Sequence, residues 1–193
     1  MRTFADLAEA LLAAPPALGG TRLVCVDGPA GSGKTTLAAR LAAALGADAA
    51  VLHMDDLYAG WTLTGAVARL LAGVLRPIAA GRPGEYHPYD WVAERFSAEP
   101  VPVPPPAVLI VEGCSSGVRE LGTWTTLLVW VEAPRPLRLA RGLARDGNEM
   151  AAHWHRWQRE EAAHFAAEGT RDRAALLVDG AGAGDGTVFT ALS

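Results

Sequence analysis

A glycine-rich stretch that ends in a single lysine carries the clearest chemistry in this sequence. Residues 28–35 read Gly-Pro-Ala-Gly-Ser-Gly-Lys-Thr, the Gly-x-x-x-x-Gly-Lys-Thr spacing of the Walker A motif. In such a loop, glycines let backbone N–H groups surround a polyphosphate, the lysine balances its charge, and the threonine hydroxyl ligates Mg²⁺. Lys34 is the only lysine in a chain that otherwise uses arginine. We therefore expect this loop to bind a nucleoside triphosphate with Mg²⁺.

The residues on either side of this loop provide the context that the motif requires. An apolar run at 22–27 predicts a buried strand, and 34–45 predicts a helix whose positive N-terminal end points at the bound anion. The residues expected to bind the nucleotide are Gly28, Pro29, Ala30, Gly31, Ser32, Gly33, Lys34, Thr35 and Thr36.

Apolar runs alternate with helical patterns along the rest of the chain. Further strands are expected at 49–53, 107–111, 125–131 and 174–178. Further helices are expected at 3–13, 62–76, 134–145 and 149–167, with Pro77 ending the second of these. We expect a loop at 81–90 and an extended proline-valine connector at 100–106. This alternation predicts an α/β protein, in which a five-stranded parallel sheet carries helices on both faces.

The composition excludes several classes of protein. The chain has 193 residues, a net charge of -4 and a pI of about 5.7, whereas nucleic-acid binders usually carry a basic face. No apolar run approaches the roughly 18 residues of a membrane span, and the N-terminus lacks the apolar core of a signal peptide. Two cysteines are too few for a disulfide framework or a zinc site. We expect a cytoplasmic monomer or homodimer that binds neither nucleic acid nor membrane.

Acidic side chains follow two of the expected strands at their carboxyl ends, where parallel α/β sheets bind ligands. Asp55 and Tyr58 come after the second strand, and Glu112 comes after the third. A phosphate loop flanked by such acids suits a Mg-nucleotide site with a base that accepts a proton from the acceptor. Two alternatives remain open: Asp55 as the N-cap of a helix, and Glu112 as an exposed acid at a strand end.

Three segments together resemble the uridine kinase-like branch of P-loop kinases, which includes phosphoribulokinase and bacterial pantothenate kinase. They are residues 26–35, His53–Tyr58 and Leu109–Gly113, and residues 138–146 are similar to the arginine-bearing lid of that family. The resemblance implies a three-layer P-loop NTPase fold, ATP and Mg²⁺ as cofactors, and a single P-loop kinase domain over residues 1–193. Its lid segment would lie at about 138–165.

The same resemblance assigns roles to individual residues. Asp55 would act on the acceptor hydroxyl, Glu112 would join Thr35 at the Mg²⁺, and Arg141 and Arg145 would embrace the phosphates together with Lys34. The implied reaction transfers the γ-phosphoryl of ATP to a hydroxyl of a small molecule. The residues expected to bind this acceptor are Asp55, Tyr58, Tyr86, His87 and Asp90.

The acceptor itself stays open, because residues 84–91 lack the pattern with which the family reads a nucleoside. A nucleoside is one candidate. These loop residues are equally explained by packing, and Trp154 and Trp157 are better explained by packing of their helix. The arginines at 138, 141 and 145 share one helical face, which a solvated surface would also explain.

Two other functions remain as alternatives. One is a nucleoside monophosphate kinase of the cytidylate type, in which Arg82, Arg95 and Arg119 would bind the acceptor phosphate. The paired acids Asp55 and Asp56 would repel such an acceptor. The other is a regulatory nucleotide-binding NTPase without kinase activity. The Asn-Lys-x-Asp motif of guanine-nucleotide switches is absent, since the chain has no second lysine.

Overall fold

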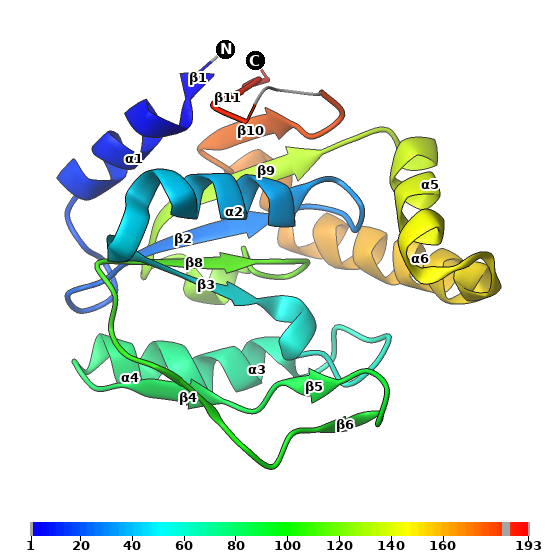
Figure 1. Cartoon of the computed structure of the whole chain (residues 1–193), viewed down its shortest axis with the longest axis horizontal. Helices are drawn as coiled ribbons and strands as arrows, with labels where there is room; N and C mark the ends of the chain where they lie inside the picture. Colours follow the sequence, from blue (N-terminus) through cyan, green and yellow to red (C-terminus); the bar gives the residue numbers. More distant parts are fainter. Residues whose placement is uncertain (1, 183–185, 193) are drawn as a thin grey trace.

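The computed structural model describes residues 2–182 and 186–192 and shows a parallel sheet between two layers of helices (Figure 1). Each strand of the sheet runs parallel to its neighbours. In spatial order the strands are β3 (Ala49–His53), β8 (Val108–Glu112), β2 (Arg22–Asp27), β9 (Thr125–Glu132) and β10 (Leu176–Asp179). The predicted α/β fold with a five-stranded parallel sheet is confirmed, and each strand lies within two residues of its expected bounds.

Side chains of β2 alternate between two separate cores because successive residues of a strand point to opposite faces of the sheet. Val24 and Val26 pack with α1 (Phe4–Ala13) and α2 (Lys34–Leu45) on one face. Leu23 and Cys25 belong to the core of the opposite face, which α6 (Ala151–Glu168) joins through Trp157. All four β2 side chains are fully buried, as expected for a strand covered on both sides.

The helix expected at 62–76 begins later and ends later than predicted. It starts as α3 (Ala66–Leu70), continues through a π-helical turn (Leu71–Leu75) and ends as α4 (Arg76–Ala79). The prediction that Pro77 ends this helix is wrong. The π turn lets the Arg76 N–H bond the carbonyl of Leu71, so Pro77 falls in the first turn of a new α-helical segment, where its missing N–H costs little.

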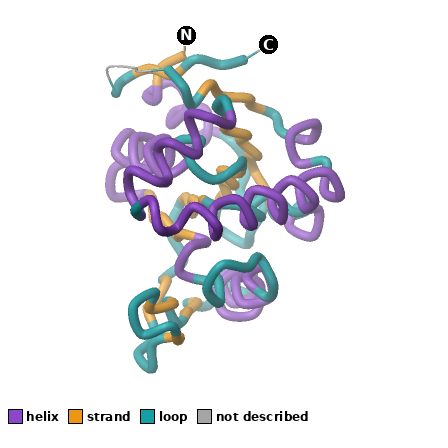
Figure 2. Tube along the Cα trace, turned by 90° about the vertical axis from the view of Figure 1, so that its right-hand side faces the viewer, coloured by secondary structure: helices purple, strands orange, loops and turns teal. Residues whose placement is uncertain are grey.

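The segments expected to be a loop (81–90) and an extended connector (100–106) contain short antiparallel strands. β4 (Gly84–Tyr86) pairs with β7 (Val101–Val103), and β5 (Tyr89–Asp90) pairs with β6 (Arg95–Phe96). We call residues 84–103 the β arm, and Figures 1 and 2 show it at the end of the molecule far from both termini. β4 approaches the π turn so closely that a Cβ on Gly73 would lie 2.4 Å from the Glu85 carbonyl oxygen.

The remaining helices lie between β9 and β10 in the chain. α5 (Arg135–Asp146) and α6 cover most of the segment 138–165 in which the resemblance places a lid, and we refer to them as the lid helices; the short α7 (Thr170–Arg173) follows them. Figure 1 shows the arrowheads of the strands pointing toward α5 and α6. Near the termini, β1 (Arg2–Thr3) pairs with β11 (Val188–Phe189). Single 3₁₀ turns lie at Gly46–Asp48, Met54–Asp56, Arg119–Leu121 and Asn148–Met150. No helix in the described part of the chain is long and apolar enough to cross a membrane.

Candidate active site

The phosphate loop passes so close to neighbouring backbone that two of its glycines have no room for a side chain. A Cβ on Gly28 would lie 2.1 Å from the carbonyl oxygen of Val131, and a Cβ on Gly31 would lie 2.5 Å from that of Arg138. Both glycines also have positive φ angles, 141° and 78°, which other residues rarely adopt. The glycine spacing therefore lets the loop fit between β9 and α5 and continue directly into α2.

Asp27, to which the sequence analysis gave no role, holds the start of this loop. Its Oδ1 accepts the N–H of Gly28 at 2.7 Å, and its Oδ2 accepts the N–H of Gly117 at 2.8 Å. Burial raises the pKa of this carboxyl from 3.8 to about 6, although both hydrogen bonds act in the opposite direction. Asp27 thus ties the loop after β2 to the loop after β8.

Lys34 is buried at the start of α2, and its ammonium group turns back to the phosphate loop. Nζ donates to the carbonyl oxygen of Pro29 at 3.0 Å and lies 3.9 Å from the sulfur of Cys114. Burial by itself lowers the pKa of Lys34, but the Cys114 sulfur and the carboxylates of Glu112 and Asp27 raise it above its ordinary value. The lysine therefore keeps its positive charge within the loop, as a phosphate site requires.

Thr35 and Glu112 lie together, as the sequence analysis expected. The Thr35 hydroxyl donates to Oε1 of Glu112 at 3.0 Å, and Nδ1 of His53 lies 2.6 Å from the same oxygen. Glu112 is buried, so the alternative that it is an exposed acid is wrong. A hydroxyl and a carboxylate beside the phosphate loop are the oxygen donors that Mg²⁺ prefers, and this donor set fits that ion.

His53 is a residue of this site that the sequence alone favours as a buried strand residue, whereas its side chain is 44% exposed. In the parallel pairing of β3 with β8, His53 is the register partner of Glu112, which explains why the two side chains meet. Its hydrogen bond to Glu112 raises the pKa of the imidazole above its ordinary value. The one feature of the sequence that could have identified His53 as a site residue is its position at the carboxyl end of a strand, two residues before Asp55.

A cleft of about 870 Å³ opens beside the phosphate loop and collects most of the predicted site residues. Those that line it are Ala30, Gly31, Gly33, Lys34, Thr35, Thr36, Asp55, Tyr58, Glu112, Arg141 and Arg145. A second cavity of about 480 Å³ lies on the other side of the loop and is bounded in part by residues 179–180. Gly33, Thr36 and Arg141 line both, so the loop lies between two hollows.

Asp55 lies in the 3₁₀ turn that follows β3 and reaches the cleft. The surrounding protein raises the pKa of its carboxyl by desolvation and by the nearby charge of Glu112, against the effect of Lys34 and Arg145. The next helix begins at Ala66 with Gly65 as its N-cap, so the alternative that Asp55 caps a helix is wrong. Its position suits a group that accepts a proton in the cleft.

Three residues predicted to bind the acceptor do not line the cleft. The Tyr86 hydroxyl donates to Oδ2 of Asp56 at 3.2 Å, and Nδ1 of His87 lies 2.9 Å from the Ser97 carbonyl oxygen. Asp90 accepts the N–H groups of Val92 and Ala93, each at 2.9 Å, and so stabilises the turn of the β arm. Their neighbours Tyr89 and Trp91 line the cleft instead.

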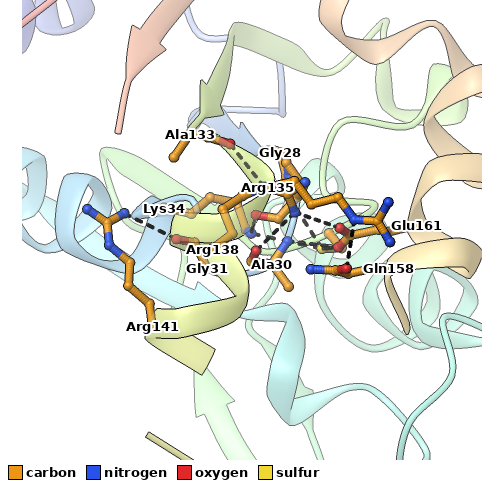
Figure 3. Close-up of polar contacts among 12 residues, drawn as sticks. Gly28, Ala30, Gly31, Lys34, Ala133, Arg135, Arg138, Arg141, Gln158 and Glu161 are labelled. Carbon is orange, nitrogen blue, oxygen red and sulfur yellow. Dashed lines mark hydrogen bonds and ion pairs between the residues drawn. The ribbon is translucent and has the colours of Figure 1, made fainter. Parts of the chain in front are cut away.

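Two of the four arginines on α5, Arg138 and Arg141, hold the backbone of the phosphate loop (Figure 3). Arg138 donates to the carbonyl oxygens of Ala133 at 3.0 Å and Ala30 at 3.3 Å, and Arg141 donates to that of Gly31 at 3.2 Å. The Arg138 side chain is only 11% exposed, so a solvated basic face does not describe it. Arg145 differs, because its side chain is 66% exposed and is paired with Asp146 at 2.7 Å.

Glu161 of α6, like Asp27 and His53, is a residue to which the sequence analysis gave no role. This carboxylate is 2% exposed; its Oε2 accepts the N–H of Ala30 at 2.8 Å and its Oε1 pairs with Arg138 at 2.9 Å (Figure 3). The Cys114 thiol donates to the same carboxylate at 3.6 Å. The one feature of the sequence that could have pointed to Glu161 is its position four residues after Trp157, on a helix with a buried face. Glu161 joins the lid to the phosphate loop.

The strand, the glycine-rich loop and the helix that follows, set in a five-stranded parallel sheet, define the fold of the P-loop NTPases. The solved structures that share this fold with the chain include two with kinase names. One is named "Possible Uridine Kinase from Bacillus stearothermophilus", with a TM-score of 0.66 and 23% identity over 90% of this chain and 96% of that one. The other is a "putative fructose transport system kinase" from Silicibacter sp. TM1040, with a TM-score of 0.64 and 23% identity over 84% and 95% of the two chains.

Comparisons of the sequence alone find no related protein. No protein-family model matches the chain, and a search of curated proteins finds no significant match. These likenesses establish the fold of the chain and leave its activity to the chemistry of the site.

Proposed function

We propose that this protein is an ATP-dependent kinase that transfers the γ-phosphoryl group of Mg-ATP to a hydroxyl of a small molecule. The observation that carries the proposal is the position of the phosphate loop between two hollows that share Gly33, Thr36 and Arg141. The smaller one suits the nucleoside part of ATP, and the larger one, which contains Asp55, suits the acceptor. A kinase needs two such compartments that meet at the transferred phosphoryl group.

Each step of the reaction has a candidate residue. The acceptor oxygen attacks the γ-phosphorus and forms a new P–O bond, while the bond to the β–γ bridging oxygen breaks and ADP leaves with that electron pair. Asp55 accepts the hydroxyl proton, and Lys34 balances the charge on the phosphate oxygens. Thr35 and Glu112 would hold Mg²⁺, which neutralises phosphate charge when bound.

The arrangement of the arginines favours an acceptor without a phosphate group. Arg82, Arg95 and Arg119, the candidates for binding a nucleoside monophosphate, are absent from the described lining of the cleft. Arg141 is engaged with the backbone and Arg145 with Asp146. Both structural neighbours carry kinase names, which also supports the proposed reaction type.

The test is a panel assay that measures ADP formation with nucleosides, sugars, pantothenate and nucleoside monophosphates as acceptors. We expect one class of alcohol to stimulate ADP formation and to yield a phosphate monoester detected by mass spectrometry. The stimulation should disappear in Asp55→Asn. Tight ATP binding with no stimulation by any alcohol would contradict the proposal and favour a regulatory nucleotide-binding protein.

A further inference from the structure

The wall of the large cleft away from the phosphate loop is aromatic. The chain has six tryptophans, and four of them line this one cleft together with two tyrosines. We call these six residues the aromatic wall: Tyr58, Trp61, Tyr89, Trp91, Trp154 and Trp157. They come from the segment after β3, from the β arm and from α6, three parts of the chain that the fold brings together.

Trp61 lies at the centre of this wall. Its ring centroid is 5.9 Å from that of Trp91, and 6.1 Å from those of both Trp154 and Trp157. Trp154 and Trp157 are buried, which fixes the back of the wall, whereas Trp91 is 42% exposed and Trp61 is partly exposed. Exposed indole surface in a concave site is unfavourable in water and is typical of a surface that a ligand covers.

The charges of the cleft indicate which ligand this would be. Glu94 follows Trp91 by three residues, and both line the cleft with Asp55. Lys34 and Arg141 donate to backbone carbonyls of the phosphate loop, and Arg145 is paired with Asp146. Lys34, Arg141 and Arg145 are thus engaged with the loop and with Asp146. His153 also lines the cleft, 5.4 Å from the ring of Trp61, and its Nδ1 lies 3.1 Å from Arg156. The carboxylates of Asp55 and Glu94 accompany the aromatic wall. Indole faces together with carboxylates attract cations and disfavour anions.

The aromatic wall also lies directly beside the expected base. Nε1 of Trp91 donates to the backbone carbonyl oxygen of Asp55 at 3.2 Å. A group bound against Trp91 is therefore close to the carboxylate that would take the hydroxyl proton. A short acceptor, with few bonds between its cation and its hydroxyl, is enough to reach both.

We infer that the acceptor is an alcohol that carries a positively charged nitrogen, bound by the aromatic wall and Glu94. This inference rests on the proposed kinase function. The reaction would convert the alcohol and ATP into the phosphate monoester of that alcohol, ADP and a proton, which Asp55 receives. The quaternary or protonated nitrogen takes no part in the bond changes and serves recognition alone.

The decisive comparison uses two probes of the same shape. Choline and 3,3-dimethyl-1-butanol differ in having a positive nitrogen or a neutral carbon at the same position. We expect choline to bind roughly 10-fold more tightly, as judged by titration calorimetry and tryptophan fluorescence, because cation–π contacts with desolvated indoles have about that effect. Equal binding of the two probes, or tighter binding of the neutral alcohol, overturns the inference.

Variants locate the binding site. Glu94→Gln should weaken choline binding severalfold and leave the neutral alcohol unaffected, whereas Glu85→Gln, an exposed acid of the same β arm outside the cleft, should change neither. Trp91→Leu should weaken choline binding while ATP binding stays unchanged. Unaltered choline binding in both Glu94→Gln and Trp91→Leu would overturn the inference.

The inference and the proposed function can fail separately. Phosphorylation of uridine, a neutral nucleoside, in preference to choline would uphold the kinase and overturn the inference. If no alcohol is phosphorylated, the kinase proposal fails, yet the two-probe binding comparison without ATP still decides whether the aromatic wall recognises a cation.

Discussion

The carboxylate of Glu161 accepts the backbone N–H of Ala30 at 2.8 Å, which attaches helix α6 to the phosphate loop across 131 residues of sequence. The other oxygen of the same carboxylate pairs with Arg138, whose guanidinium also donates to the Ala30 carbonyl. Both polar groups of Ala30 are thus bound by the lid. Because α6 also carries Trp154 and Trp157, one helix forms the back of the cleft and supports the loop.

Glu161→Ala should weaken both the fold and nucleotide binding. It leaves the buried guanidinium of Arg138 unpaired, a change that lowers the free energy of unfolding by about 3–5 kcal/mol. Glu161→Gln keeps an acceptor for the Ala30 N–H and should recover part of the ATP affinity. Denaturant unfolding and ATP titrations measure the two effects, with Glu120→Gln at an exposed position as control. Equal ATP affinity in Glu161→Ala and the wild type would show that the contact does not shape the loop.

Asp55→Asn should separate binding from chemistry. Loss of a general base lowers turnover by about 10²–10⁴, while the ATP affinity should stay within a few-fold of normal because the loop is intact. The measurement is steady-state kinetics with the acceptor found in the panel assay. Asp56→Asn is the matched control, since Asp56 binds Tyr86 outside the cleft and its loss should leave turnover nearly unchanged. Similar turnover losses in both variants would argue against Asp55 as the base.

Asp27→Asn should change how stability depends on pH. Burial raises the pKa of Asp27 to about 6, so the folded state holds this proton more tightly than the unfolded chain does. The stabilisation from the protonated carboxyl is complete below about pH 4 and is lost as the pH rises through 6. A shift of about two pKa units corresponds to about 3 kcal/mol.

The quantity to measure is therefore the difference in unfolding free energy between the wild type and Asp27→Asn. As the pH rises from 4 to 7, the wild type should lose up to about 3 kcal/mol of unfolding free energy relative to Asp27→Asn. Asp48→Asn, at an exposed 3₁₀ turn, serves as control for the loss of one surface charge. A difference that is constant over this pH range would refute the buried-carboxyl argument.

Gly142→Ala should disturb the junction of the two lid helices. A Cβ at Gly142 would lie 2.2 Å from the indole ring of Trp154, so the buried ring has to move. We expect a loss of about 1–3 kcal/mol in unfolding free energy and an altered fluorescence of the cleft tryptophans. Gly20→Ala is the matched control, because a Cβ there meets nothing within 4 Å. A Gly142→Ala protein as stable as the control would mean that Trp154 packs more loosely than the structure shows.

The parts of this protein that its sequence determined are those encoded within short segments. The β2–loop–α2 unit was predictable because an apolar run, glycines at fixed spacing and one lysine lie within 24 residues. The parallel sheet followed from apolar runs that alternate with helical patterns, and the rule that strand ends meet at one edge placed Glu112 beside the loop. Its pairing with Thr35 was implied by the family resemblance. The failure at Pro77 shows the limit of a local rule, since the π turn before it allows the helix to continue.

Only the tertiary structure decided which distant residues share a site. His53 meets Glu112 because two strands 59 residues apart pair in a particular register, and Glu161 reaches Ala30 because α6 packs against the loop. In the β arm, Asp90 was predicted to bind the acceptor but stabilises a turn, whereas its neighbours Tyr89 and Trp91 line the cleft. Such contacts depend on strand order, register and helix packing, which are set by the whole core at once. No pattern within a single segment encodes them.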